Sequence, residues 1–340
     1  MAKDQGDILE FWRQNFPAWP EKKYGWFYKS NPYGKSACLI ARNGKNDDMI
    51  GSAVFFPRQV IIDGHTQLVG ITADFGIKKE HRAFGPAISL QKALITTSRE
   101  DRLGFLYGFP NIHAELPKKR AGFETLGQTI RLVRILKYDH YIDRIIGWRL
   151  MARVFSGILN TMYKTLTWEN FYGRNRKFKF EILTAFDDRF NRLWREASPA
   201  YKIIGERTAD YLNWRFSQCP YQTYKIFALT DKDDQGILGY IVYQVIDKHA
   251  YIADLFAFKA GHKLDTLLSK YLLYIRNQEI DSVSYVYFGD KAIINKFKKY
   301  NFIKRDGARR IMVYIDRQSP YLNCLLDKNN WHLMEGDNDI

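Results

Sequence analysis

The chain has 340 residues, 46% of them hydrophobic, which is enough for about two domains with buried cores. Its 52 lysines and arginines outnumber its 37 aspartates and glutamates, and the net charge of +15 favours an anionic partner such as a phosphorylated cofactor. Three widely spaced cysteines exclude a disulfide framework or a metal site and indicate a reduced, cytoplasmic protein. We expect no signal peptide, no membrane span and, without any signature of a nucleic-acid-binding module, no nucleic-acid partner.

An aromatic segment near the N-terminus recurs in the second half of the chain. Residues 24–42 read YGWFYKSNPYGKSACLIAR, and residues 211–230 read YLNWRFSQCPYQTYKIFALT. Trp26 matches Trp214 and Pro32 matches Pro220, each pair being 188 residues apart. Both copies continue with a β-type run, an acidic turn and a second strand, so the sequence predicts a repeated structural unit.

The repeat continues downstream. Residues 71–77 (ITADFGI) resemble 251–258 (YIADLFAF), and residues 118–127 (KKRAGFETLG) resemble 298–307 (KKYNFIKRDG). The separation between matching residues falls from 188 at Trp26 to 179 at Phe123. We attribute this change to a hairpin at Asp63-Gly64 that the second copy is expected to lack. We predict an α/β fold of the α+β type with two tandem domains, 1–138 and 181–316, a basic helical linker at 139–180 and a C-terminal tail at 317–340.

The linker carries an apolar stripe at helical spacing, including Ile142, Ile146 and Leu150. A helix that packs this stripe against the domains is the simpler interpretation. The alternative is a helix lying on an anionic membrane surface, held by arginines such as Arg144 and Arg149.

A glycine-containing turn at 78–86 joins the strand at 71–77 to a helix that begins near Gly85 and ends at about Thr97. Backbone N–H groups at a helix start lack intrahelical partners and carry partial positive charge, so they suit a phosphate. Gly85 permits close approach of the backbone to a ligand, Ala87 keeps the next side chain of the motif small, and Arg82 supplies positive charge. These residues predict a pyrophosphate site.

The order Arg82-x-x-Gly85-x-Ala87, after a strand and opening a helix, resembles the acetyl-CoA pyrophosphate loop of the GNAT N-acetyltransferase superfamily. Asn111-x-x-Ala114 and the later Gly122-Phe123 resemble its next conserved segment. The first copy carries the resemblance over about residues 25–137, and the repeat extends it to about 212–316. Within the superfamily the chain looks like a bacterial group with a GFPN element (108–111), whose substrates are mostly unassigned.

The resemblance implies two GNAT-like domains, each a mixed, mostly antiparallel sheet flanked by helices, with acetyl-CoA or another acyl-CoA in a V-shaped gap between strands. The first domain would hold the cofactor, and its acyl group would pass directly to the amine of a small-molecule, sugar or peptide acceptor. The cofactor-binding residues implied are Phe75, Ile77, Arg82, Ala83, Phe84, Gly85, Pro86, Ala87 and Asn111, with the backbone at Phe75–Ile77 stabilising the oxyanion.

Three side chains are candidates for the acid and base steps. Lys118 stands where many relatives carry a tyrosine that protonates the leaving thiolate, although a lysine here could instead contact the CoA phosphates. Asp74 lies on the strand that leads to the loop and could bind an ammonium substrate or accept its proton. His81 is a candidate base because histidine is the side chain best suited to proton transfer near neutral pH, the alternative being an exposed loop histidine.

The second copy reads GHKLDTL from Gly261, so Asp265 stands where Gly85 does. Because a carboxylate there would repel a pyrophosphate, we expect no cofactor in the second domain. The acidic C-terminal stretch is expected to be solvated, with the alternative that it reaches back to a cleft. Two other functions remain open: a non-catalytic CoA- or anion-binding module, and a transferase that uses aminoacyl-tRNA as its donor.

Overall fold

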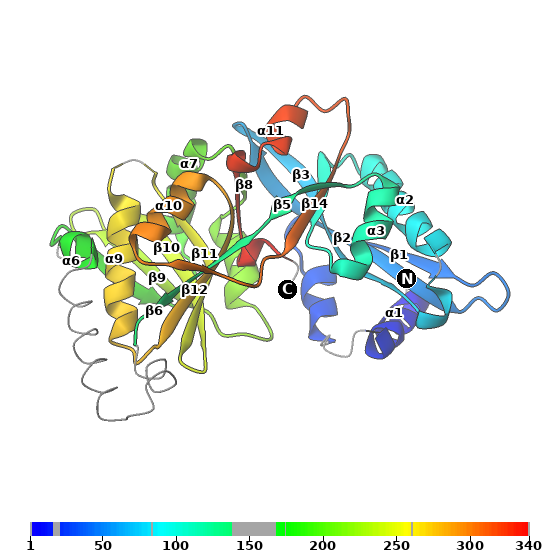
Figure 1. Ribbon diagram of the computed structural model, residues 1–340, viewed down its shortest axis with the longest axis horizontal. Helices are drawn as coiled ribbons and strands as arrows, with labels where there is room; N and C mark the ends of the chain where they lie inside the picture. Colours follow the sequence, from blue (N-terminus) through cyan, green and yellow to red (C-terminus); the bar gives the residue numbers. More distant parts are fainter. Residues whose placement is uncertain are drawn as a thin grey trace.

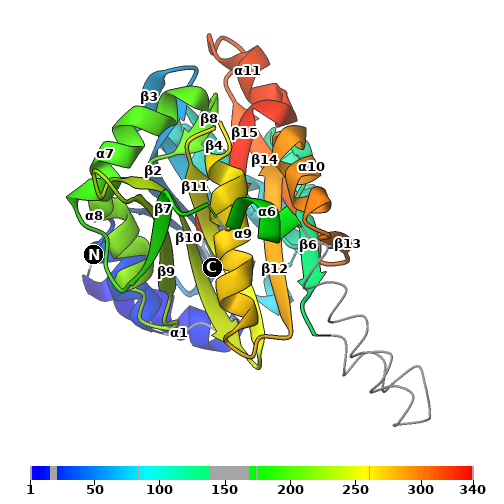
Figure 2. The same ribbon diagram turned by 90° about the vertical axis from the view of Figure 1, so that its left-hand side faces the viewer.

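The computed structural model describes residues 2–15, 21–82, 84–137, 168–173, 175–259 and 261–338. The apolar stripe predicted at 142–162 lies outside these ranges. Within them the chain forms a mixed sheet flanked by helices, with two α/β halves side by side (Figure 1), and α9 lies across the strands of the second half (Figure 2). No helix of the described ranges has the length and apolar character needed to cross a membrane.

The first half follows the order predicted for the repeat. Its elements are α1 (Ala2–Asn15), the π-helical turn η1 (Tyr24–Lys29), β1 (Ala37–Arg42), β2 (Met49–Ile62), β3 (His65–Ile77), the 3-10 turn η2 (Lys79–His81), α2 (Phe84–Glu100), β4 (Phe105–Gly108), α3 (Ile112–Ala121), β5 (Glu124–Gln128) and β6 (Ile130–Ile135).

The second half runs through the same order after an added N-terminal part. Its elements are α6 (Trp168–Gly173), β7 (Phe178–Leu183), α7 (Asp188–Ala197), η3 (Ser198–Ala200), β8 (Ile203–Gly205), α8 (Ala209–Leu212), the π-helical turn η4 (Asn213–Ser217), β9 (Lys225–Asp231), β10 (Ile237–Ile246), β11 (His249–Ala257), α9 (Lys263–Arg276), β12 (Ser282–Gly289), α10 (Lys291–Lys299), β13 (Ile303–Arg305) and β14 (Arg310–Ile315). The C-terminal segment adds α11 (Leu322–Leu326), η5 (Lys328–Asn330), β15 (Trp331–Met334) and η6 (Glu335–Asp337).

The two tryptophans that identified the repeat contact each other. The indole N–H of Trp26 donates to the carbonyl of Trp214 at 2.7 Å, and the indole N–H of Trp214 donates to the carbonyl of Trp26 at 3.3 Å. Trp214, Arg215 and Phe216 are all buried. The reciprocal bonds relate η1 to η4 by an approximate two-fold arrangement, as expected for equivalent segments of a repeat.

Both halves contain the same hairpin, so the expectation that the second copy lacks it is wrong. The first hairpin, β2–β3, turns at Asp63 and Gly64, with φ of 48° and 84°, and the second, β10–β11, turns at Asp247 and Lys248, with φ of 45° and 64°. The first pair of strands has 14 and 13 residues and the second has 10 and 9. Longer strands therefore account for the change in the repeat separation.

Strand β2 is buried on both faces, and its alternating side chains enter different cores. Ala53 and Phe55 pack with the apolar face of α2, whereas Val54 and Phe56 pack in the large core that includes η1 and η4. This double burial explains why the segment is an almost continuous apolar run rather than an alternation of apolar and polar residues.

The last strand of each half pairs with the other half. β14 lies between β4 and β5, antiparallel to both, through pairs such as Met312 with Gly108 and Val313 with Glu124. β6 lies between β12 and β13 in the same way, with Leu132 opposite Tyr285 and Lys304. The two halves therefore exchange their last strands. The predicted domain boundaries at 138 and 181 divide the sequence, and they remain a prediction.

Candidate active site

Strands β3 and β4 run parallel for a short distance and then separate. Their pairing consists of Gly70 with Leu106 and Ile71 with Tyr107. Just beyond it, the Thr72 hydroxyl donates to the Tyr107 carbonyl at 3.2 Å and accepts from the Lys118 ammonium at 2.8 Å. These contacts close the narrow end of a gap whose open end faces the starts of α2 and α3.

A β-bulge bends β3 where the gap opens. Ser52 pairs with Gly76 and Val54 pairs with Ala73, so the intervening Ala53 faces both Asp74 and Phe75. Asp74 adopts a left-handed conformation (φ 49°), and the Ser52 hydroxyl donates to its carbonyl at 3.0 Å. Bulges redirect strands next to active sites, and this one separates the direction of the Asp74 side chain from that of Phe75, which lines the gap.

A cavity of about 520 Å³ occupies the open end of the gap, a size typical of small-molecule sites. Five of the residues predicted to bind the cofactor line it together: Phe75, Ile77, Arg82, Ala87 and Asn111. The remaining lining residues are Asn15, Gly76, Ile112, His113, Ala114, Leu116 and Pro117. The end of β3 and the start of α2 thus form one wall, and the first turns of α3 form the other.

The start of α2 has the chemistry that a pyrophosphate requires. A Cβ added to Gly85 would meet no other atom of the described chain within 4 Å, so the fold leaves open space there. The first turn contains no acidic residue, and the exposed Arg82 is anchored by a bond from Nε to the Ile77 carbonyl at 3.2 Å. Pro86 is half-buried in this turn, whereas Ala83 and the side chain of Phe84 lie outside the described residues. These features fit the phosphate end of an acyl-CoA.

Asn111 has a structural task as well as a place in the cavity wall. Its side-chain oxygen accepts from the N–H groups of His113 and Ala114 at 3.1 and 3.0 Å, which caps the N-terminus of α3. The helix ends at Gly122, which has a φ of 113°. The Asn-x-x-Ala and Gly-Phe motifs therefore mark the two ends of the helix that forms one cavity wall.

Solved structures share this arrangement of strands and helices. A GCN5-related N-acetyltransferase from Anabaena variabilis matches 92% of this chain and 70% of its own with a TM-score of 0.63 and 15% identity. A probable N-acyltransferase from Enterococcus faecalis matches 94% of this chain and 72% of its own (TM-score 0.63, 11% identity). The N-myristoyltransferase of Saccharomyces cerevisiae with bound myristoyl-CoA matches 94% and 77% (TM-score 0.56, 11% identity).

The chain has the GCN5-related N-acetyltransferase fold. The α/β fold with a mixed sheet flanked by helices, predicted from the sequence, is thereby confirmed. No protein-family model matches the chain, and no curated protein sequence matches it significantly.

Within this N-acetyltransferase fold, the three predicted catalytic side chains do not meet in the cavity. The buried carboxylate of Asp74 accepts from Lys23 Nζ at 3.1 Å and from the Tyr28 hydroxyl at 2.5 Å, on the side of η1. His81 is half-buried in η2, apart from the cavity lining. Lys118 is buried at the narrow end of the gap, where its ammonium also lies 4.3 Å from the centre of the Phe123 ring.

In the second half of the N-acetyltransferase fold, the chain itself fills the equivalent gap. β11 and β12 pair in parallel from His249 with Ser282 to Ile252 with Tyr285, and beyond this point β15 lies between them, antiparallel to β12. The Leu255 N–H donates to Met334 Sδ at 3.2 Å, and His332 Nε2 donates to the Leu255 carbonyl at 3.1 Å. Leu255 is the repeat equivalent of Phe75, so a sulfur atom of β15 occupies the position opposite the matching backbone N–H.

The residue that replaces Gly85 in the second half is also engaged. The Asp265 carboxylate accepts from Lys296 Nζ at 2.6 Å and lies 3.7 Å from His262 Nδ1. An ion pair therefore stands where the first half has open space.

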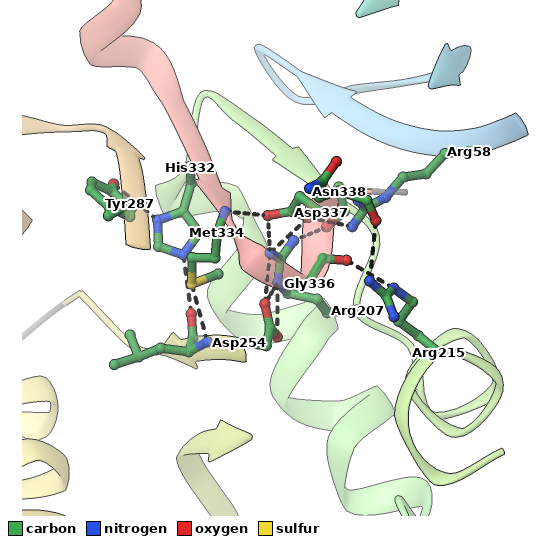
Figure 3. Close-up of polar contacts among 12 residues, drawn as sticks. Arg58, Arg207, Arg215, Asp254, Tyr287, His332, Met334, Gly336, Asp337 and Asn338 are labelled. Carbon is green, nitrogen blue, oxygen red and sulfur yellow. Dashed lines mark hydrogen bonds and ion pairs between the residues drawn. The ribbon is translucent and has the colours of Figure 1, made fainter. Parts of the chain in front are cut away.

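The C-terminal segment ends in a buried polar cluster (Figure 3). The Asp337 carboxylate bridges Arg58 of the first half, at 2.6 Å, and Arg207 of the second, at 3.0 Å. Arg215 donates to the carbonyls of Gly336 and Asn338 at 3.0 and 3.1 Å. Residues 331–334 and 336–338 are buried, so the expectation of a solvated acidic tail is wrong.

The pKa values of Asp337 and His332 in this cluster are both lowered, although burial acts on them in opposite directions. Burial raises the pKa of the Asp337 carboxyl, but Arg207 and Arg58 outweigh burial and hold it below its ordinary value. Burial, aided by the Arg207 guanidinium, lowers the pKa of His332 to about 3. The neutral imidazole donates from Nε2 to Leu255 and accepts at Nδ1 from the Tyr287 hydroxyl at 3.2 Å.

Proposed function

We propose that the protein is an acyl-CoA-dependent N-acyltransferase whose cofactor binds in the cavity between β3, α2 and α3. One observation carries the proposal: the cavity at the diverging ends of β3 and β4 is lined by five of the nine residues that the sequence marked for cofactor binding. The neighbouring N-myristoyltransferase structure, which has the same fold, contains myristoyl-CoA. A CoA thioester would supply an activated carbonyl to an amine acceptor.

Different segments of the chain bind different parts of the acyl-CoA in this proposal. The free N–H groups at the start of α2, together with Arg82, hold the pyrophosphate. The backbone of Phe75–Ile77 directs hydrogen bonds into the cavity, and the bulge at Asp74 sets its angle. The second half supports this role for Phe75, because the matching N–H of Leu255 donates to a sulfur atom.

Among the acid and base candidates, we propose Lys118 as the group that donates a proton at the narrow end of the gap. Its hydrogen bond to Thr72 places the amine nitrogen of Lys118 where the two strands diverge. Asp74 is assigned to holding the bulge through Lys23 and Tyr28, since its carboxylate is directed toward η1. A role for His81 as the base, and the identity of the acceptor amine, remain predictions that kinetics must test.

Titration calorimetry with CoA and acetyl-CoA tests the cofactor site, using a Gly85→Glu variant. A carboxylate about 4 Å from a phosphate charge costs roughly 1 kcal/mol in water and roughly 4 kcal/mol at a partly buried site, so we expect a loss of affinity between about fivefold and about 10³-fold. Gly44→Glu is the matched control, because a Cβ at Gly44 also meets open space and the added charge is the same. Absent binding by the wild type, or equal binding by Gly85→Glu, contradicts the proposal.

A non-catalytic CoA-binding module is the second candidate, and one observation favours it. The polar groups of Asp74 and Lys118 are both bound to other side chains of the protein. Release of free CoA thiol across a panel of amines separates the two functions, because a binding module would bind acyl-CoA saturably and release no thiol above the rate of spontaneous hydrolysis.

A further inference from the structure

The α3 wall of the cavity exposes two large apolar side chains. Ile112 is 78% exposed and Leu116 is 43% exposed, and both line the cavity. They are four residues apart on one helix and therefore share a face. Large apolar side chains grouped at a concave site mark a place where an apolar partner is removed from water.

The two walls of the cavity differ in chemistry. The wall of β3 and α2 provides Arg82 and helix N–H groups, which suit the anionic end of a cofactor, beside the apolar side chains of Phe75, Ile77 and Ala87. The α3 wall provides Asn111 and His113 at the start of the helix and the apolar side chains of Ile112, Leu116 and Pro117. A fatty acyl-CoA has the same division between a charged and an aliphatic part. A donor that carries only an acetyl group would bring one methyl to this wall.

From this complementarity we infer that the acyl donor carries an aliphatic chain longer than acetyl, and that Ile112 and Leu116 bind this chain. The inference rests on the proposed acyl-CoA site and specifies its substrate. Ile112 and Leu116 are thereby specificity-determining residues, since they contact the chain and not the reacting carbonyl.

Calorimetry with CoA, acetyl-CoA and octanoyl-CoA, below the micellar concentration, tests the inference. Each methylene removed from water strengthens binding about fourfold. Burial of half of the six additional methylenes of octanoyl-CoA therefore gives roughly 60-fold tighter binding than acetyl-CoA. In the double variant Ile112→Ser/Leu116→Ser this gain should fall at least about tenfold, while acetyl-CoA affinity changes less than about threefold.

Ile303→Ser is the matched control, because Ile303 is 44% exposed on β13 and lies apart from the cavity. It should retain the full preference for octanoyl-CoA, and melting temperatures should show that all variants are folded. Equal affinity for acetyl-CoA and octanoyl-CoA overturns the inference but leaves the acyl-CoA function standing. A preference that survives in the double variant overturns the assignment to Ile112 and Leu116, and a protein that binds no CoA species contradicts the proposed function itself.

Discussion

Replacing Asp337 by asparagine keeps the side-chain volume and removes the charge that joins the two halves. Asp337, Arg58 and Arg207 are each at most 2% exposed. Arg207 keeps a second carboxylate, Asp254, at 2.9 Å. Among the residues that the structure describes, Arg58 would keep the Tyr107 hydroxyl at 3.4 Å and the face of the Tyr211 ring, whose centre is 4.8 Å away. The substitution therefore leaves one buried guanidinium without a counter-charge.

Removing one partner of a buried ion pair costs about 3–5 kcal/mol, a large part of the roughly 5–15 kcal/mol that stabilises a typical domain. Urea unfolding followed by circular dichroism should show this loss in the free energy of unfolding of Asp337→Asn. Asp316→Asn is the control, because the Arg99–Asp316 pair is exposed at 3.3 Å and should contribute no more than about 1 kcal/mol. A cost for Asp337→Asn as small as that of the control would refute the assignment of Asp337 as the bridge.

Two further predictions concern titration and catalysis. The pKa of His332 is about 3 in the folded protein and about 6.5 in the unfolded chain. Between these two pH values only the unfolded state binds a proton at this residue. The contribution of His332 to the free energy of unfolding is therefore complete above pH 6.5 and is lost as the pH falls toward 3. Between pH 7 and 5 this group should lower the free energy of unfolding by about 2 kcal/mol, and that part of the pH dependence should be missing from urea titrations of His332→Gln. Lys118→Met should lower kcat about 10²–10⁴-fold with little change in acyl-CoA affinity, and an unchanged kcat in a thiol-release assay would exclude Lys118 as the proton donor.

The sequence could predict the fold, and the repeat supplied an internal comparison for the residues proposed to bind the cofactor. Arg82 and Gly85 stand out only because the second copy, with similar surroundings, has Asp265 in the loop. The open space around Gly85 gives the physical reason: packing within the protein does not require a glycine there. Ile112 and Leu116 were missed, since two apolar residues in a short helix are ordinary core residues until their exposure is known.

The exchange of β6 and β14 could not be predicted from sequence. Both segments are basic, apolar strands of six residues, and antiparallel pairing uses backbone groups that every residue has. By its sequence, either strand could therefore pair between β4 and β5 or between β12 and β13. Which strand pairs in which place depends on how the two halves approach each other. The burial of Asp337 was equally hidden, because it depends on two arginines far away in the sequence.

Because of the strand exchange, the sheet of the first half is completed only after most of the second half has been synthesised. β5 is complete at residue 128, but β14, which pairs with it and with β4, ends only at residue 315. At roughly 5–20 residues per second, translation leaves the first half waiting roughly 10–40 s for this strand. Unless β6 pairs there in the meantime, β4 and β5 present unpaired backbone edges throughout that interval, and such edges are templates for association with other chains. The nascent first half is therefore the form of this protein with the greatest need of a chaperone, whatever the stability of the finished fold.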